Sequence, residues 1–242
     1  MSQGSEIEEL DLLAFAAHPD DAELNAGGLI AKMVRLGHKV GIVDLTRGQM
    51  ASRGSVAQRQ AEAAKATEIL GLSVRENLGL VDGELSADDP LARRKVVEVI
   101  RKYRPSVVLA GLEVDRHPDH YRGGQLVSDA ACLADRVKYD TGQERHQIKR
   151  LCYYPEHFVK EVSFVVDISE DFETKRRAVM AFSSQFYQAE QKGPATFISS
   201  KEFMGFWEAK ARYFGGLIGR TYGEPYYMHQ PAEIFDPVEL WS

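Results

Sequence analysis

Two short segments of the chain combine imidazole and carboxylate side chains around a proline. They are residues 17–21, with the sequence AHPDD, and residues 116–120, with the sequence RHPDH. Neutral imidazole nitrogens and anionic carboxylate oxygens are ligands that a borderline metal such as zinc accepts. Two histidines and one aspartate can hold such a metal and leave positions open for water and substrate. A carboxylate and an imidazole are then left over, as metal-assisted hydrolysis requires. The two segments therefore indicate a catalytic site rather than a structural one.

Each segment alone has a simpler explanation. His-Pro-Asp is common in loop turns, and an Asp-Asp pair before a helix is usually a helix cap. The pair of segments is harder to dismiss because each one follows an apolar run of the strand type, at residues 10–17 and 106–110. The remaining histidines have no comparable carboxylate cluster, and we expect them to be surface or core residues: His38, His146, His157 and His229.

Strand and helix patterns alternate along the chain and must position these segments. Strands are predicted at about residues 10–17, 40–45, 76–80, 106–110, 151–155 and 163–168, and helices at about 23–36, 55–70, 90–104, 119–137, 171–182 and 201–219. The alternation predicts an α/β fold, a Rossmann-like doubly wound, largely parallel sheet with helices on both faces. Ligands collect beyond the carboxyl ends of parallel strands, so the fold should bring both segments to one crevice. We expect a single domain over residues 1–242, with a core of about 10–170 and a C-terminal helical extension of about 171–242.

The composition limits the classes of partner. Of 242 residues, 44% are hydrophobic and 27% charged, which is typical of a globular protein with a full core. The net charge of −6 argues against nucleic acid as a partner, and no apolar run approaches the ~20 residues of a membrane span. The polar residues 1–9 lack the apolar segment of a signal peptide, so we expect a cytoplasmic protein. We expect Cys132 and Cys152 to be small buried thiols without a disulfide.

Arginines are concentrated near the predicted crevice. Arg47, Arg53 and Arg59 lie in the loop and helix start after the second predicted strand, and Arg116 begins the second metal-binding segment. Most arginines are solvated surface groups, but arginine is also the residue suited to bidentate carboxylate binding. We therefore expect an anionic group on the substrate. The pair Gly27-Gly28 lies inside a predicted helix and lacks the Gly-x-Gly-x-x-Gly pattern, so it is a poor phosphate motif.

These residues resemble the LmbE/PIG-L family of zinc-dependent N-acetylglucosamine deacetylases. The likeness extends from the two metal-binding segments through residues 45–48 (LTRG), 71–79 (GLSVRENLG) and 101–105 (RKYRP). Residues 164–169 (FVVDIS), 184–187 (SQFY) and 198–201 (ISSK) are similar to the branch that acts in bacillithiol biosynthesis. That branch hydrolyses N-acetylglucosaminyl malate to glucosaminyl malate and acetate. The resemblance thus implies Zn²⁺ as cofactor, this small molecule as substrate, and a homo-oligomer.

The resemblance also implies a role for each residue of the site. The residues that would bind zinc are His18, Asp21 and His120. Asp20 would be the general base, and a protonated His117, oriented by Asp119, would stabilise the oxyanion. The residues that would lie near the substrate are Arg59, Arg116 and Arg53, and Arg116 is our first choice for the malate carboxylates. The stretch 49–52 (QMAS) departs from the family pattern, where we expect an acidic residue and a Gly-Thr pair.

Two other functions remain open at this point. A sibling deacetylase acting on an inositol glycoside or a chitooligosaccharide would share the same catalytic set. A receiver domain, in which an acidic pair after the first strand binds magnesium, is an alternative from another class. That alternative requires a phosphoacceptor aspartate after the third strand and a lysine after the fifth, and we can place neither. It also gives no role to His18 or His120.

Overall fold

The computed structural model describes residues 9–159, 161–189, 193–236 and 238 of the chain. Most of the polar N-terminal stretch, and residues 190–192 and the last residues of the expected C-terminal extension, lie outside the described residues. Among the described helices, none combines the length and apolar character that crossing a membrane requires.

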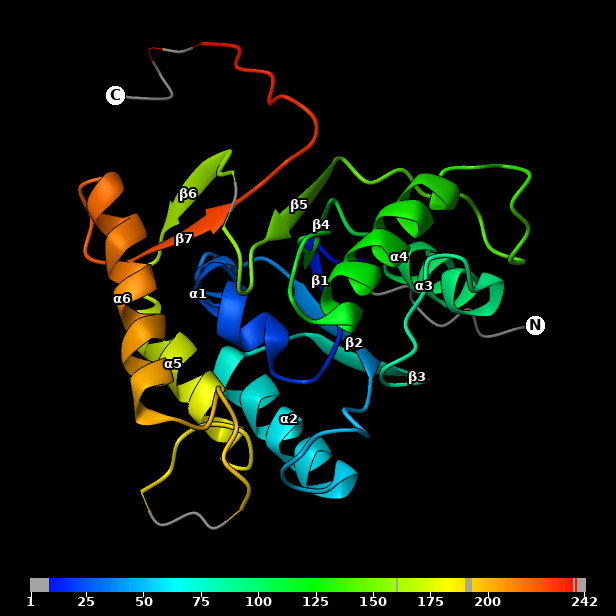
Figure 1. The fold of residues 1–242 in the computed structure, drawn as a ribbon. Helices are drawn as coiled ribbons and strands as arrows, with labels where there is room; N and C mark the ends of the chain where they lie inside the picture. Colours follow the sequence, from blue (N-terminus) through cyan, green and yellow to red (C-terminus); the bar gives the residue numbers. More distant parts are fainter. Residues whose placement is uncertain (1–8, 160, 190–192, 237, 239–242) are drawn as a thin grey trace.

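A five-stranded parallel sheet forms the centre of the molecule, in the order β3-β2-β1-β4-β5 (Figure 1). The strands are β1 (Leu12–Ala16), β2 (Val40–Thr46), β3 (Val74–Leu80), β4 (Val107–Gly111) and β5 (Arg150–Tyr154). The helices between them are α1 (Asp21–Arg35), α2 (Val56–Leu70), α3 (Pro90–Tyr103) and α4 (Pro118–Ala134). Helices α1 and α2 share one hydrophobic core with one face of the sheet, and α3 and α4 share a second core with the other face. The predicted doubly wound α/β fold is confirmed.

Strand β1 is the central strand, and its position explains why the segments 17–21 and 116–120 meet. Leu12 of β1 pairs in parallel with Val40 of β2 on one side and with Val107 of β4 on the other. All five residues of β1 are buried, because helices cover both faces of the sheet, and this produces a continuous apolar run. The segment after β1 and the segment after β4 therefore leave neighbouring strands at the same edge.

A second, two-stranded sheet lies in the C-terminal part of the chain. Strand β6 (Phe164–Asp167) pairs antiparallel with β7 (Gly223–Tyr226). Helix α5 (Phe172–Ala181) packs against α1 and α2, and α6 (Lys201–Leu217) packs against β7. The sequence analysis did not predict β7, since its Gly-Glu-Pro-Tyr sequence has neither alternation nor an apolar run.

The pair of glycines inside α1 allows this C-terminal part to approach the helix. A Cβ atom on Gly28 would lie 2.6 Å from Cδ1 of Ile168, so no larger residue fits there. The backbone N–H groups of Gly28 and Leu29 donate to the two carboxylate oxygens of Glu224 at 2.8 and 2.7 Å. Lys175 Nζ donates to the same carboxylate at 2.6 Å. The buried ion pair of Lys175 and Glu224 therefore joins α5 to β7, and the two amide hydrogen bonds join both to α1.

The two cysteines have different environments. Cys152 is buried in β5, as expected, whereas Cys132 is exposed, so the prediction of a buried thiol there is wrong. Ala130, Ala131 and Ala134 of the same stretch are buried in the hydrophobic core between α4 and the sheet. Cys132 lies on the exposed side of the helix. An Ala-rich run within a helix does not show by itself which position faces outward.

Candidate active site

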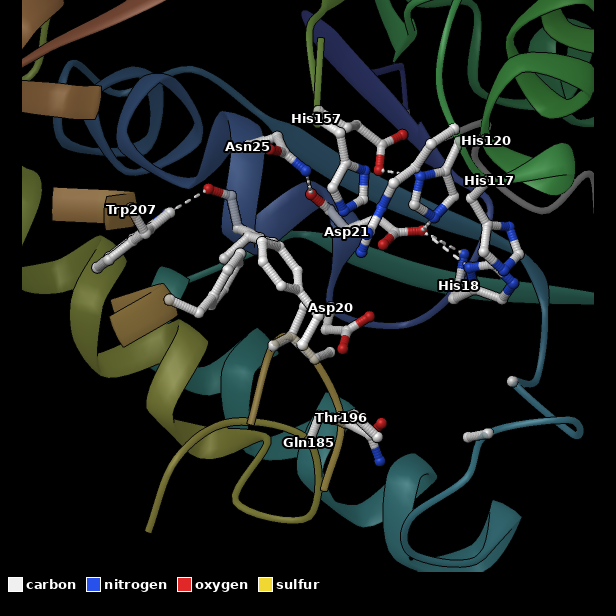
Figure 2. Close-up of a pocket in the computed structure, with 18 of the residues that line it drawn as sticks. His18, Asp20, Asp21, Asn25, His117, His120, His157, Gln185, Thr196 and Trp207 are labelled. Carbon is white, nitrogen blue, oxygen red and sulfur yellow. Dashed lines mark hydrogen bonds and ion pairs between the residues drawn. The ribbon is translucent and has the colours of Figure 1, made fainter. Parts of the chain in front are cut away.

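A cavity of about 470 Å³ lies beyond the carboxyl ends of the parallel strands (Figure 2). Its walls come from the loops after all five strands and from α6 with the segment that precedes it. His18 and Asp21 enter it from the loop after β1, and His120 enters it from the first turn of α4. Residues about one hundred positions apart in the sequence thus meet in one site, as the fold prediction requires.

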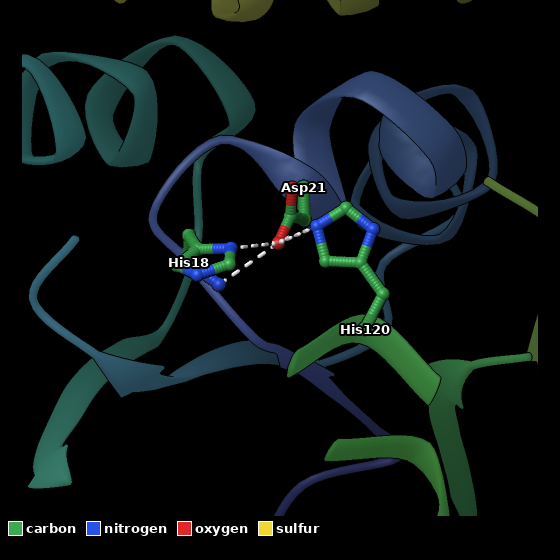
Figure 3. Close-up of side chains that lie close together, drawn as sticks. All are labelled: His18, Asp21 and His120. Atoms are coloured by element: carbon green, nitrogen blue, oxygen red, sulfur yellow. Dashed lines mark hydrogen bonds and ion pairs between the residues drawn. The ribbon is translucent and has the colours of Figure 1, made fainter. Parts of the chain in front are cut away.

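His18, Asp21 and His120 point toward one another (Figure 3). Nδ1 of His18 lies 3.1 Å from Oδ2 of Asp21, and Nε2 of His120 lies 3.6 Å from the same oxygen. One ligand atom from each of these three buried residues lies within 4.8 Å of the others. Two imidazole nitrogens and one carboxylate oxygen form the donor set of a catalytic site for a borderline divalent metal.

The second nitrogen of His18 is held by carboxylates on the far side of the ring. Nε2 lies 3.0 Å from Oδ1 of Asp82 and 3.6 Å from Oδ2 of Asp119. Burial lowers the pKa of His18, but hydrogen bonds to Asp119, Asp21 and Asp82 raise it, and the result lies well above the usual 6.5. The carboxylates fix the ring orientation and surround it with negative charge, which is the environment that a bound divalent cation neutralises.

His120 has the same arrangement on the other side of the site. Its Nδ1 lies 2.7 Å from Oε2 of Glu156 and 3.1 Å from Oδ1 of Asp115. Burial lowers the pKa of His120, while Glu156 and Asp21 raise it well above its usual value. Each histidine therefore directs one nitrogen to Asp21 and the other to carboxylates, a pattern typical of histidines that bind metal.

Asp20 lies beside the three converging residues but turns its carboxylate to a different partner. It occupies the N-cap position of α1, yet its side chain accepts no capping hydrogen bond. Its Oδ1 lies 2.7 Å from Nη2 of Arg59. Burial raises the pKa of Asp20 to about 7, although Arg59 opposes the shift. A carboxylate whose pKa is close to neutral pH is suited to act as a general base.

His117 is oriented by the helix that it caps. Its Nδ1 accepts a hydrogen bond from the backbone N–H of Asp119 at 3.3 Å, so the proton of a neutral imidazole lies on Nε2. Burial lowers the pKa of His117, and the charges of His120 and His18 act in the same direction. In its neutral form the ring presents one N–H donor, at Nε2.

Asp119 differs from the arrangement that the resemblance implies. Its backbone N–H, and not its carboxylate, makes the contact with His117. The carboxylate accepts backbone N–H groups from Gly83 at 2.6 Å and Leu85 at 3.3 Å, and it faces His18. Asp119 thus contacts one histidine of each segment: its backbone N–H orients His117, and its carboxylate supports the ring of His18.

The four arginines expected near the crevice have different positions in the structure. Arg59 and Arg116 line the cavity, whereas Arg47 and Arg53 do not. The guanidinium of Arg53 donates to the carbonyl oxygens of Ser184 and Pro194, at 3.0 and 3.1 Å. Our expectation that all four border one crevice is therefore wrong, because the C-terminal segment that binds Arg53 was not predictable as its partner.

Arg116 is the cavity arginine that is free to meet a ligand. Its guanidinium carbon lies 4.5 Å from the centre of the Phe197 ring. Within the described ranges, no carboxylate oxygen lies within 4 Å of its nitrogens. Arg59, in contrast, is buried and paired with Asp20.

The sequence analysis missed four residues of the site, which are Asp82, Asp115, Glu156 and His157. His157 was expected to be a surface or core residue, and that prediction is wrong: it lines the cavity, with Nδ1 3.0 Å from Oδ1 of Asp115. Its ring stacks on that of His120, with the ring centres 5.6 Å apart. Glu156 and His157 lie in the loop just after β5, so the rule that ligands lie beyond strand ends would have found them.

Comparison with known proteins shows the family to which the chain belongs. The sequence profile described as "PIG-L: GlcNAc-PI de-N-acetylase" matches residues 13–131. Diacetylchitobiose deacetylase of Thermococcus kodakarensis is 31% identical over 232 residues, which cover 88% of this chain and 80% of the relative. The chain belongs to the PIG-L family.

Further relatives of this PIG-L protein include a solved structure. A conserved protein of Thermus thermophilus is 39% identical, with a TM-score of 0.86, over 96% of this chain and 99% of the other. A probable N-acetyl-alpha-D-glucosaminyl L-malate deacetylase 2 of Bacillus anthracis is 30% identical over 147 residues, 55% of this chain and 64% of the relative. The matched region runs from β1 into α4 and contains both segments 17–21 and 116–120. The protein is therefore a hydrolytic enzyme of a deacetylase family.

Proposed function

We propose that this protein removes the acetyl group from N-acetylglucosaminyl malate, giving glucosaminyl malate and acetate in bacillithiol biosynthesis. The observation that carries the deacetylase proposal is the convergence of His18, Asp21 and His120 beside the carboxylate of Asp20, at the floor of one cavity. This arrangement supplies metal ligands and a base for the attack of water on an amide. The PIG-L relatives named as deacetylases support the same chemistry.

Zinc is the proposed metal, and the donor set supports this choice. Two imidazoles and one carboxylate suit zinc better than magnesium, which prefers an octahedron of oxygen ligands. Such a metal supplies Lewis-acid polarisation of the amide carbonyl and a water of lowered pKa. His18, Asp21 and His120 would hold it, and the carboxylates behind the two rings would keep both imidazoles in place.

Asp20 carries the proton in this mechanism, and His117 stabilises the developing negative charge. Asp20 accepts a proton from the attacking water and then gives it to the leaving amine nitrogen. His117 directs its Nε2–H to the oxygen that gains negative charge as the carbonyl carbon becomes tetrahedral. The C–N bond breaks, acetate leaves, and the glucosaminyl product carries a free amine.

Arg116 supports malate as the anionic part of the substrate. It lines the cavity beside His117, and no carboxylate of the described residues neutralises it within 4 Å. A planar guanidinium suits the carboxylates of malate. A substrate carboxylate can therefore replace Phe197 as its partner without breaking an existing ion pair.

Diacetylchitobiose is the second candidate substrate. The deacetylase of Thermococcus kodakarensis named for it matches 88% of this chain, a longer region than the relative named for the malate conjugate. The cavity also contains the aromatic side chains of Phe158, Phe197, Phe206 and Trp207, which suit a second sugar ring. This substrate carries no negative charge, so it makes no use of Arg116.

Release of free amine, measured on three substrates, tests the proposal. The substrates are N-acetylglucosaminyl malate, diacetylchitobiose and N-acetylglucosamine, with zinc content determined on the same sample. Loss of a charge-assisted bond of about 1.5–3 kcal/mol in Arg116→Ala should lower kcat/KM for the malate conjugate about ten- to a hundredfold. The same variant should leave diacetylchitobiose hydrolysis almost unchanged, and Arg136→Ala, at an exposed site just after α4, serves as control. Equal losses on charged and neutral substrates contradict the malate assignment and leave the deacetylase assignment standing.

A further inference from the structure

Arg59, the buried arginine of the cavity, binds the turn that carries Asp20. Its Nη2 lies 2.7 Å from Oδ1 of Asp20, and its Nε donates to the carbonyl oxygen of Pro19 at 2.9 Å. The residue is only 6% exposed. It comes from α2, so the helix after β2 holds the loop after β1. The guanidinium is therefore engaged by the protein itself, although the resemblance implies a place near the substrate.

The backbone of Asp20 has an unusual conformation at this contact. Its φ is 122°, and among the described residues other than glycine only Arg104 also has a positive φ. L residues rarely adopt this region. An aspartate at an N-cap normally accepts a hydrogen bond from the first turn of its helix, but the carboxylate of Asp20 does not. The turn thus directs the carboxylate away from the helix and toward Arg59.

The loop after β2 completes the enclosure of the guanidinium. Gly48 has a φ of 66°, and a Cβ atom there would lie 3.1 Å from Nη1 of Arg59. The backbone of Gly48 therefore passes close to the guanidinium. With Pro19 and Asp20 on one side and Gly48 on the other, Arg59 has a fixed position.

We infer that Arg59 positions the general base, holding the carboxylate of Asp20 and its strained turn in the orientation that faces the attacking water. It does not bind the anionic end of the substrate. This inference rests on the proposed function, in which Asp20 accepts the proton. Arg116, the other arginine of the cavity, is the contrasting case, because it has no carboxylate partner within 4 Å in the described part of the chain.

Replacing Arg59 by lysine separates positioning from substrate binding. A lysine keeps the charge but lacks the planar fork that reaches Pro19 and Asp20 together. We expect Arg59→Lys to lower kcat about 10²-fold, as a misplaced catalytic group does. KM should stay within about threefold of the wild type, since substrate binding is not removed. A raised KM with unchanged kcat would show that Arg59 binds substrate, and would overturn the inference.

Guanidinium ion offers a second measurement. Arg59→Ala leaves a space of guanidinium shape beside Asp20, so millimolar guanidinium in solution should restore part of the lost kcat. Absence of any rescue in a folded, zinc-containing Arg59→Ala protein contradicts the inference. If this variant does not fold, the kcat and KM of Arg59→Lys decide the question alone.

Arg101 provides a matched control for the loss of a buried arginine. It is 4% exposed and donates to backbone carbonyl oxygens of Ala134 and Tyr139, at 3.1 and 2.7 Å, and it does not line the cavity. Arg101→Lys should lower the melting temperature and leave kcat unchanged. If Arg101→Lys lowers kcat as much as Arg59→Lys does, the effect is general destabilisation and the inference fails.

The wild-type measurement distinguishes this inference from the proposed function. If the wild type releases no amine from any N-acetylglucosamine conjugate, the proposed function fails and this inference fails with it. If the wild type is active and Arg59→Lys affects KM alone, only this inference fails.

Discussion

Asp20 and Asp21 are adjacent in the chain, but their carboxylates meet different partners. Asp21 lies between two histidine rings, whereas Asp20 lies against Arg59. We expect Asp21→Ala, His18→Ala and His120→Ala each to lose both zinc and activity, because each removes one of three ligands. Full zinc occupancy in any of these variants would remove that residue from the ligand set.

Asp20→Asn should behave in the opposite way with respect to the metal. The amide keeps the size of the side chain but cannot accept a proton. We therefore expect zinc to remain bound while kcat falls about 10²–10⁴-fold. Single-turnover kinetics with zinc content measured on the same sample checks this. Near-normal turnover with bound zinc would assign the base to another group, and His117 would be the first to examine.

Asp119→Asn tests the support behind His18. The variant keeps the backbone N–H that orients His117, but it removes the negative charge beside Nε2 of His18. Affinity for zinc should fall about 10–100-fold, as is common when a carboxylate behind a metal-binding histidine is lost. Competition with a zinc chelator measures this, with the exposed Asp129→Asn on the same helix as control. Equal affinity in the two variants contradicts a supporting role for the Asp119 carboxylate.

The residues nearest the proposed metal follow from the sequence, and those behind them do not. His18, Asp21 and His120 lie in two compact segments, each after an apolar strand. Local sequence was sufficient to recognise the segments, and a parallel sheet places the ends of its strands at one edge. Asp82 and Glu156 come from loops that have no motif of their own, and only the position of Glu156 just after β5 could have indicated it. Their contacts depend on the strand order β3-β2-β1-β4-β5, which a single sequence does not determine.

At the level of elements, the position of α1 matters for the site because its first residue is Asp21, a proposed metal ligand. Gly28 sits where this helix meets Ile168, with 2.6 Å between the added Cβ position and the nearest side-chain atom. Gly28→Ala should therefore lower stability by about 1–3 kcal/mol through overpacking. Urea unfolding gives the measurement.

Gly205→Ala is the matched control within another helix. A Cβ atom on Gly205 of α6 would meet nothing within 4 Å. Since alanine is the better helix former, this variant should gain up to about 1 kcal/mol. If both substitutions change stability in the same direction, helix propensity and not the contact with Ile168 governs position 28.

The sequence predicted the elements of the central sheet better than those of the C-terminal part. Strands β1 and β4 are continuous apolar runs, and β2 is mostly apolar, because both faces of the sheet are covered. Strand β7 contains a proline and a buried glutamate, and its pairing with β6 joins residues more than fifty positions apart. From the sequence alone, Glu224 would be predicted to lie on the surface, because its partners Lys175 and the α1 amides are known only from the fold.

At the scale of the whole molecule, Glu224 joins the C-terminal part to α1. Its carboxylate accepts hydrogen bonds from two α1 amides, from Lys175 and from Tyr226. Glu224→Gln leaves the lysine buried without an anionic partner, which should cost about 3–5 kcal/mol. Glu173→Gln, which breaks an exposed pair with Arg176, should change stability by less than about 1 kcal/mol. Similar effects of the two changes in urea unfolding would contradict this role of Glu224.

The distance along the chain between Glu224 and α1 has a consequence for synthesis on the ribosome. Gly28 and Glu224 are 196 residues apart. At a translation rate of about 5–20 residues per second, α1 leaves the ribosome roughly 10–40 seconds before its partner is made. During that interval the face of α1 that later meets Ile168 and Glu224 stays uncovered, and the nascent chain is open to chaperones and to aggregation. Variants at Glu224 should therefore reduce the yield of folded protein in cells more than the turnover of those molecules that complete folding.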